Sequence, residues 1–166
     1  IDGVVRKSLH HAIGLMDVIE LENVSDIYRL VPTEGKILKP IKINESEKSK
    51  KLVRVVTKTS INKETTQTGF HDGRSTLAEV KAGVGDTCVM QIPDQKILDI
   101  IKLEAGCQGL VVRGINAGQI GKVESVEEGT FILPKRVILI LGDKKIEIPA
   151  DIIMPIGKEE PVIQLK

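Results

Sequence analysis

Three histidines are the first residues in this sequence that could do chemistry, because an imidazole can act as a general base or bind a metal. His10 and His11 are adjacent, so a strand would point them to opposite faces, where they do not readily share a metal. His71 lies beside Asp72, but no serine or cysteine in a nucleophile-elbow motif accompanies the pair, which is better explained as an Asx-type turn. We therefore predict that the chain is not an enzyme and holds no metal or cofactor.

Two cysteines and the lack of long apolar runs narrow the class of protein further. Cys88 and Cys107 are too few for a disulfide framework, and they lack the Cys-x-x-Cys spacing of a zinc site. Both should therefore be buried thiols. There is no apolar run of about eighteen residues and no signal-peptide pattern, so we expect a cytoplasmic chain that does not contact a membrane. The start at Ile1, in a strand-like run without a methionine, leads us to expect that an N-terminal part is missing.

Positive charge is concentrated in one segment. Residues 36–63 contain nine lysines and arginines against two glutamates, a net charge of +7, whereas the whole chain carries +1. The rest of the chain is therefore acidic, and contact with a polyanion should be local. A solvated face of mixed lysines would give the same pattern, and the charge count alone leaves both interpretations open.

Glycines are concentrated in a second segment, residues 106–126, which predicts a hairpin. An apolar strand enters a loop that contains Gly114, Asn116 and Gly118, residues that tolerate a positive φ, and a second strand leaves it. Such a loop can turn backbone N–H groups outward to a phosphate, and Arg113, Gln119 and Lys122 add donors beside it. The alternative is a plain hairpin whose glycines serve only the turn.

The elements that would position these residues are short strands. Aromatic residues make up only 2% of the chain while isoleucine, valine and leucine are abundant, which favours a β-branched, aliphatic sheet core. Asn44 and Glu47 have the spacing of a capping box, so one short helix should run over residues 45–50. A hairpin turn is expected at residues 34–36 and polar turns at 71–74 and 83–86. Strands are predicted at residues 17–21, 27–31, 37–43, 52–61, 65–70, 87–92, 97–103, 130–133, 137–141 and 145–148.

A domain boundary is expected near Glu104, where the glycine-rich texture begins. We predict a mainly β fold with two small barrel-like domains, a central one over residues 20–104 and a smaller one over 105–166.

Residues 109–126 resemble a KOW motif, the strand-loop-strand element of several ribosomal proteins and elongation factors. Nearly the whole chain is similar to the archaeal and eukaryotic small-subunit ribosomal protein family S4e. The matching stretches are Asp2-Gly3-x-Val5-Arg6, Gly14-x-Met16-Asp17-Val18-Ile19, Lys51-Leu52-x-Arg54-Val55, His71-Asp72-Gly73-Arg74, Val84-Gly85-Asp86-Thr87, Lys96-Ile97-x-Asp99-x-Ile101-Lys102, the KOW positions Gly106, Gly114, Asn116, Gly118, Ile120 and Gly121, and Pro155-Ile156-Gly157.

The sequence also departs from the family pattern. His11 and Ala12 stand where the family usually carries Tyr-Pro, and Leu15 replaces an aromatic residue, which removes stacking partners. Arg113 replaces a common glycine and Gln119 a frequent basic residue, so the positive charge of the loop is moved by a few positions.

The resemblance implies a structural constituent of the small ribosomal subunit that binds rRNA and neighbouring ribosomal proteins and has no small-molecule substrate. It also implies that residues 1–19 are the remnant of an N-terminal RNA-binding domain and that residues 105–166 form a KOW-type, Src-homology-3-like barrel with a C-terminal tail. The residues predicted to bind RNA are Arg6, Lys39, Lys42, Lys51, Arg54, Lys58, His71, Arg74, Arg113, Gly114, Asn116, Gly118, Gln119 and Lys122.

A KOW-type protein-interaction module of a transcription or translation factor is the alternative function. Such a module would expose an apolar patch near Ile152, Ile153 and Met154 in place of a basic loop.

Overall fold

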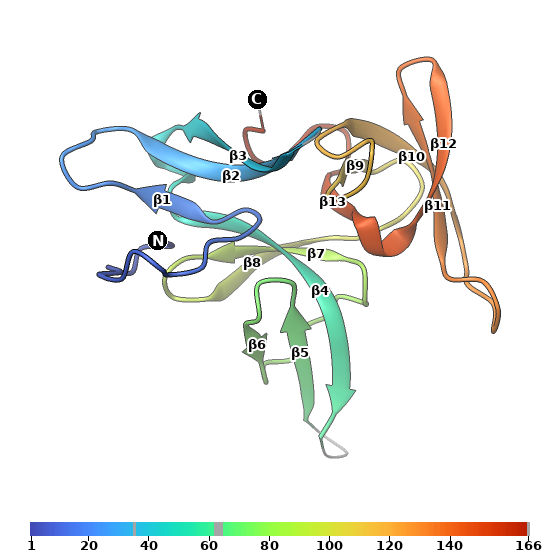
Figure 1. Cartoon of the computed structure of the whole chain (residues 1–166). Coiled ribbons are helices and arrows are strands. Elements are labelled where there is room, and N and C mark those ends of the chain that lie inside the picture. Colours follow the sequence, from blue (N-terminus) through green and yellow to red (C-terminus); the bar gives the residue numbers. More distant parts are fainter. Residues whose placement is uncertain (35, 62–64, 166) are drawn as a thin grey trace.

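The computed structural model describes residues 1–34, 36–61 and 65–165, with only the backbone for 36 and 37, and these residues form an almost purely β structure (Figure 1). Within these ranges thirteen strands lie in three sheets whose neighbouring strands are antiparallel. The helical segments are two short 3₁₀ turns, Glu45–Glu47 (η1) and Ala150–Ile152 (η2). The predicted mainly β fold is confirmed.

The first sheet is a three-stranded meander made of β1 (Val18–Glu20), β2 (Ile27–Thr33) and β3 (Lys36–Ile43). The strands pair in sequence order, as predicted, with a register shift between Val31 and Thr33. The hairpin turn expected at 34–36 includes residue 35, which lies outside the described residues. The predicted helix at 45–50 is a single 3₁₀ turn, and the Asn44 side chain makes no capping hydrogen bond.

The second sheet is built around one long strand. Its order is β6 (Ser75–Thr76), β5 (Thr66–Phe70), β4 (Lys50–Ser60), β7 (Thr87–Gln91) and β8 (Lys96–Ile101). The first half of β4 pairs with β7, and the second half pairs with β5. The alternation of β4 buries Val53 and Val55, but from Val56 onward the strand is exposed and extends away from the core (Figure 1).

The third sheet has the order β12 (Lys144–Pro149), β11 (Arg136–Leu141), β10 (Ile120–Glu127), β9 (Gln108–Val111) and β13 (Ile153–Gly157). This sheet has five strands, and its closure into the small barrel expected over residues 105–166 stays a prediction. The strand predicted at 130–133 is wrong, because these residues form the loop after β10. There the Thr130 amide donates to the Leu133 carbonyl, and the Leu133 amide donates to Thr130 Oγ1, so local bonds replace a ladder.

The hydrophobic core runs across the second and third sheets. One cluster joins Leu52 and Val89 of the second sheet to Leu110, Met154 and Ile156 of the third, and all five are buried. Met16 and Ile163, far apart in sequence, pack into the same cluster. The two units predicted on either side of residue 104 therefore share packed side chains. The position of a domain boundary there stays a prediction.

Candidate nucleic-acid interface

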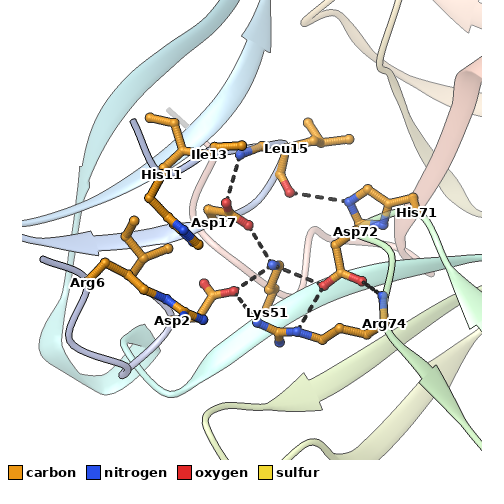
Figure 2. Close-up of a pocket in the computed structure, with 13 residues that line it drawn as sticks. Asp2, Arg6, His11, Ile13, Leu15, Asp17, Lys51, His71, Asp72 and Arg74 are labelled. Atoms are coloured by element: carbon orange, nitrogen blue, oxygen red, sulfur yellow. Dashed lines mark hydrogen bonds and ion pairs between the residues drawn. The ribbon is translucent and has the colours of Figure 1, made fainter. Parts of the chain in front are cut away.

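Lys51 on β4 lies at the centre of a buried ion cluster (Figure 2). Its Nζ lies 2.7 Å from Asp2 Oδ2, 2.6 Å from Asp17 Oδ1 and 3.1 Å from Asp72 Oδ2, and its side chain is only 1% exposed. Arg74 closes the cluster from the turn after β5, with Nη2 2.7 Å from Asp2 Oδ2 and Nε 3.5 Å from Asp72 Oδ2. An ammonium so enclosed is shielded from an external phosphate, which argues against the predicted RNA contact of Lys51.

The carboxylates of the cluster are fixed by backbone amides as well as by cations. Asp2 Oδ1 accepts from the Val18 amide at 2.9 Å, and Asp17 Oδ2 accepts from the Gly14 amide at 2.7 Å. Asp72 Oδ1 accepts from the Arg74 amide at 3.1 Å, which confirms the Asx-type turn predicted at this position. Each carboxylate is thus oriented toward the Lys51 ammonium by its own local bond.

The ion cluster shifts the pKa of two of its members. Burial disfavours the charged ammonium of Lys51, but hydrogen bonds to Asp17 and Asp2 outweigh that cost and raise its pKa. Burial likewise acts to raise the pKa of Asp72, yet Lys51, the Arg74 amide and the Arg74 guanidinium together lower it. Both groups are therefore held in their charged forms.

His71, in the same turn as Asp72, and Arg54 on β4 form hydrogen bonds within the protein. His71 Nδ1 accepts from the Arg54 amide at 3.0 Å, so in the neutral ring Nε2 carries the proton and donates to the Leu15 carbonyl at 3.2 Å. Burial lowers the pKa of His71, and Lys51 and Arg54 add to this effect, while the Leu15 bond and Asp72 oppose it. With both nitrogens occupied, His71 has no polar atom left for RNA.

The Arg54 side chain links β4 to the third sheet. Its Nη1 donates to the carbonyls of Ala150, Asp151 and Ile153, the last at 3.0 Å. Burial lowers the pKa of Arg54; Asp151 opposes this shift and Arg113 adds to it. Arg54 is half-buried, and its polar contacts within the chain are the ones that hold η2 and β13 in place.

Several of the remaining predicted cations are also occupied within the protein. Lys58 Nζ donates to the carbonyls of Val80 at 2.9 Å and Ala82 at 3.1 Å. Lys42 is exposed and pairs with Asp26 at 2.7 Å, which raises its pKa through a hydrogen bond and charge attraction. Lys39 is exposed on β3.

The glycine-rich loop between β9 and β10 turns some of its amides inward. The amides of Ala117, Gly118 and Gln119 donate to the carbonyls of Gly114, Val111 and Asn116. These three amides therefore favour the alternative of a plain hairpin, in which they serve the turn and not a phosphate. Of the predicted loop residues, Arg113 and Gly114 are exposed, Asn116, Gly118 and Gln119 are half-buried, and Lys122 is exposed on β10.

Gly118 is explained by packing and not by a ligand. Its φ is +84°, and a Cβ there would lie 2.6 Å from the Pro32 carbonyl oxygen and 2.9 Å from Thr33 Cα. The loop is therefore pressed against the end of β2, where only a glycine fits. Gly114 also has a positive φ, +91°, but no atom lies within 4 Å of its hypothetical Cβ.

Two neighbouring hollows border the exposed cations. The first, about 450 Å³, is lined by the N-terminal segment and the ion cluster, including Arg6 and His11 (Figure 2). The second, about 380 Å³, is lined by residues that include Leu38 and Arg113. Because Ile13, Gly14, Leu15 and His71 line both, the hollows adjoin along residues 13–15. Arg6 and Arg113 thus line two separate hollows that share a wall.

Arg29 is a structurally important cation that sequence reasoning missed. It is fully buried on β2, where Nη1 lies 2.7 Å from Glu47 Oε2 and Nη2 donates to the carbonyls of Glu47 and Lys50. Burial lowers the pKa of Arg29, and Glu47 opposes the shift. An arginine within the apolar run Tyr-Arg-Leu-Val was the available signal, since such a residue needs a buried partner.

The comparisons with known proteins agree with this architecture. The sequence profile of Ribosomal family S4e matches residues 24–97. Small ribosomal subunit protein eS4 of Staphylothermus marinus is 38% identical over 177 aligned residues, which cover 99% of this chain and 69% of that protein. The eS4 protein of Methanothermobacter thermautotrophicus is 35% identical, again over 99% of this chain and 69% of the relative. This chain belongs to the ribosomal S4e family.

A solved structure supports the S4e assignment through the fold. The crystal structure of 30S ribosomal protein S4e from Thermoplasma acidophilum superimposes with a TM-score of 0.80 at 28% sequence identity, covering 95% of this chain and 79% of that one. The family resemblance predicted from the motifs is therefore confirmed in sequence and in structure.

The alternative function, a KOW-type interaction module outside the ribosome, loses the feature on which it depended. Ile153 and Met154 are fully buried in β13 and Ile152 is half-buried, so they form no exposed patch.

Cys88 and Cys107 are free and buried, as predicted, and burial raises the pKa of Cys88 to about 11. Over the described ranges the structure has no helix long and apolar enough to cross a membrane, and no group of metal-binding side chains.

The Lys51→Ala substitution in this S4e chain should be severely destabilising. Removing the ammonium leaves three buried or half-buried carboxylates facing one another, and loss of one partner of a buried pair costs about 3–5 kcal/mol. Chemical denaturation measures the effect. Lys50→Ala, at the exposed neighbouring position, is the matched control and should change stability by less than about 0.5 kcal/mol. Equal effects of the two substitutions would contradict the proposed role of the ion cluster.

Stability should fall as the pH falls below 6.5, the ordinary pKa of histidine. The folded state lowers the pKa of His71, so the unfolded chain takes up the proton first and is favoured as acid is added. Asp72, with a pKa lowered from 3.8, adds a second loss at more acid pH. Denaturation midpoints measured from pH 7 to pH 5 should decline less in His71→Gln than in wild type. His10→Gln, at an exposed histidine, should keep the wild-type slope.

Gly118→Ala and Gly114→Ala should differ in stability although both residues have a positive φ. Gly114→Ala pays only the backbone term, about 1 kcal/mol. Gly118→Ala adds overlap with the Pro32 carbonyl, which costs roughly 1–3 kcal/mol more. Thermal unfolding of the two variants gives the comparison, and equal midpoints would show that the loop does not press on β2.

Proposed function

We propose that this chain is a structural constituent of the small ribosomal subunit and binds rRNA through exposed cations around the hollows beside residues 13–15. Membership of the S4e family, whose matched relatives are named small ribosomal subunit proteins, carries the assignment to the ribosome. In this function the protein binds RNA and does not catalyse a reaction. Basic side chains neutralise phosphates, and the β strands hold these side chains at fixed positions.

The distribution of free and occupied cations supports a specific set of RNA contacts. Lys51, Arg54, Lys58 and Arg74 hold carboxylates or carbonyls inside the protein, so their charges already have partners. The cations left for phosphate contact are those predicted residues that remain exposed, namely Arg6, Lys39, Lys42, Arg113 and Lys122. Lys42 would have to exchange Asp26 for a phosphate, an exposed pair that costs little to break.

Two members of this set lie at the adjoining hollows. Arg6 lines one hollow and Arg113 lines the other, on either side of Gly14 and Leu15. Structured RNA presents a shallow minor groove with phosphates on both edges, and a rigid surface with cations on its rim can follow such a shape. Recognition by this surface would depend on RNA shape and charge more than on base identity.

Filter binding of small-subunit rRNA over a salt series tests this proposal. The double variant Arg113→Glu, Lys122→Glu should weaken binding about tenfold or more and reduce the salt slope by roughly one to two, because two phosphate contacts are lost. Lys144→Glu, at an exposed lysine on the far strand β12, is the control and should bind as wild type.

Two results would contradict the proposal in different ways. Failure of wild-type protein to bind small-subunit rRNA at low salt would overturn the RNA-binding function itself. Unchanged binding by the Arg113 and Lys122 double variant, with normal wild-type binding, would overturn only the location of the contact surface.

A further inference from the structure

The loop between β10 and β11, residues 128–135, carries three exposed apolar side chains in a row. Phe131 is fully exposed, Ile132 is 86% exposed and Leu133 is 50% exposed. The loop lies at the far end of the β10–β11 hairpin, at the lower right of Figure 1, where it projects away from the rest of the molecule. We refer to residues 131–133 as the apolar tip. A consecutive run of large exposed apolar residues is unfavourable in water unless a partner covers it.

The loop is closed by specific contacts, so the tip has a defined shape. The Thr130 amide donates to the Leu133 carbonyl at 2.8 Å, and Thr130 Oγ1 accepts from the Leu133 amide at 3.2 Å. Gly129 passes so close to Lys135 that a Cβ would lie 2.7 Å from the Lys135 amide nitrogen. These contacts hold Phe131 and Ile132 outward instead of letting them fold back onto the sheet. A preorganised tip binds with a smaller loss of conformational entropy.

The charges around the apolar tip disfavour RNA. Residues 123–136 contain three glutamates and two basic residues, a net charge of −1. Lys135 pairs with Glu128 at 2.7 Å, and Arg136 pairs with Glu147 at 2.6 Å. Proteins that stack aromatic side chains on bases surround them with an excess of cations that follow the phosphates, whereas at this tip glutamates outnumber the cations.

We infer that the apolar tip is a docking knob for a neighbouring protein of the small subunit, whose surface supplies an apolar pocket for Phe131 and Ile132. A protein partner suits an aromatic and aliphatic anchor bordered by neutralised ion pairs, because protein interfaces have an apolar core and a polar rim. This inference rests on the proposed function, since it assumes that the chain lies in the small subunit. It assigns two different surfaces of the molecule different partners, RNA at the cations around the hollows beside residues 13–15 and protein at residues 131–133.

Site-specific photo-crosslinking in small subunits tests the inference. The full protein carrying Phe131→p-benzoylphenylalanine is expressed in cells, the small subunits are isolated on a gradient, and they are irradiated. The expected product is one adduct that resists nuclease, is sensitive to protease and contains a peptide of another ribosomal protein. Adding Ile132→Asp and Leu133→Asp should reduce its yield about tenfold, because charged groups would face the apolar pocket.

A matched control separates a local effect from general damage. Leu98→Asp replaces an exposed leucine on β8, remote from the tip, and should leave the adduct yield unchanged. All of these positions are exposed, so the unfolding midpoints of the variants should equal that of wild type.

The outcomes distinguish this inference from the proposed function. Co-sedimentation with small subunits but an adduct with rRNA, an adduct with a second copy of this chain, or no adduct at all would overturn the docking knob and leave the proposed function standing. Failure of the protein to co-sediment with small subunits at all would overturn both.

Discussion

The Lys51 ammonium brings together three carboxylates from two separate parts of the chain, and the surface proposed to bind RNA is shaped around it. Asp2 and Asp17 come from the N-terminal segment, and Asp72 comes from the turn after β5. Without this group the segment over residues 1–17 would lose its ionic attachment to β4. The two hollows are bounded by that segment, so a buried ion cluster that touches no ligand sets the form of the surface where a ligand would bind.

The cations of this chain therefore divide into two classes with different chemistry. Arg29, Lys51 and Arg54 are buried or half-buried and form bonds to carboxylates or to backbone carbonyls within the protein. Arg6 and Arg113 stay at the surface, where their charge can act on a polyanion. A count of lysines and arginines along the sequence includes both buried and exposed cations. It therefore overestimates the number of cations that can contact RNA.

Sequence patterns predicted most of the strands, because the burial of a strand is reflected in the pattern of its own residues. The strands β6 and β13 were not among those predicted. The alternation of Val53 and Val55 marks the buried face of β4, and the glycines after Gly106 mark the hairpin of β9 and β10. The site was harder to predict because burial of a cation depends on partners that are distant in sequence. The residues near Lys51 in the sequence do not indicate that its partner is Asp2, forty-nine positions away. The close approach of Gly118 to Pro32 likewise exists only after the first and third sheets have packed together.

The last described residues contribute to a core that begins near the first ones. Ile163 packs with Met16 and Leu52, and the Gln164 amide donates to the Glu47 carboxylate that holds Arg29. During translation the early strands leave the ribosome many residues before Ile163 is made. The nascent chain must therefore hold an unfinished core open to solvent until Ile163 has left the ribosome. A truncation before residue 163 would leave apolar surface exposed and direct the product toward degradation instead of assembly.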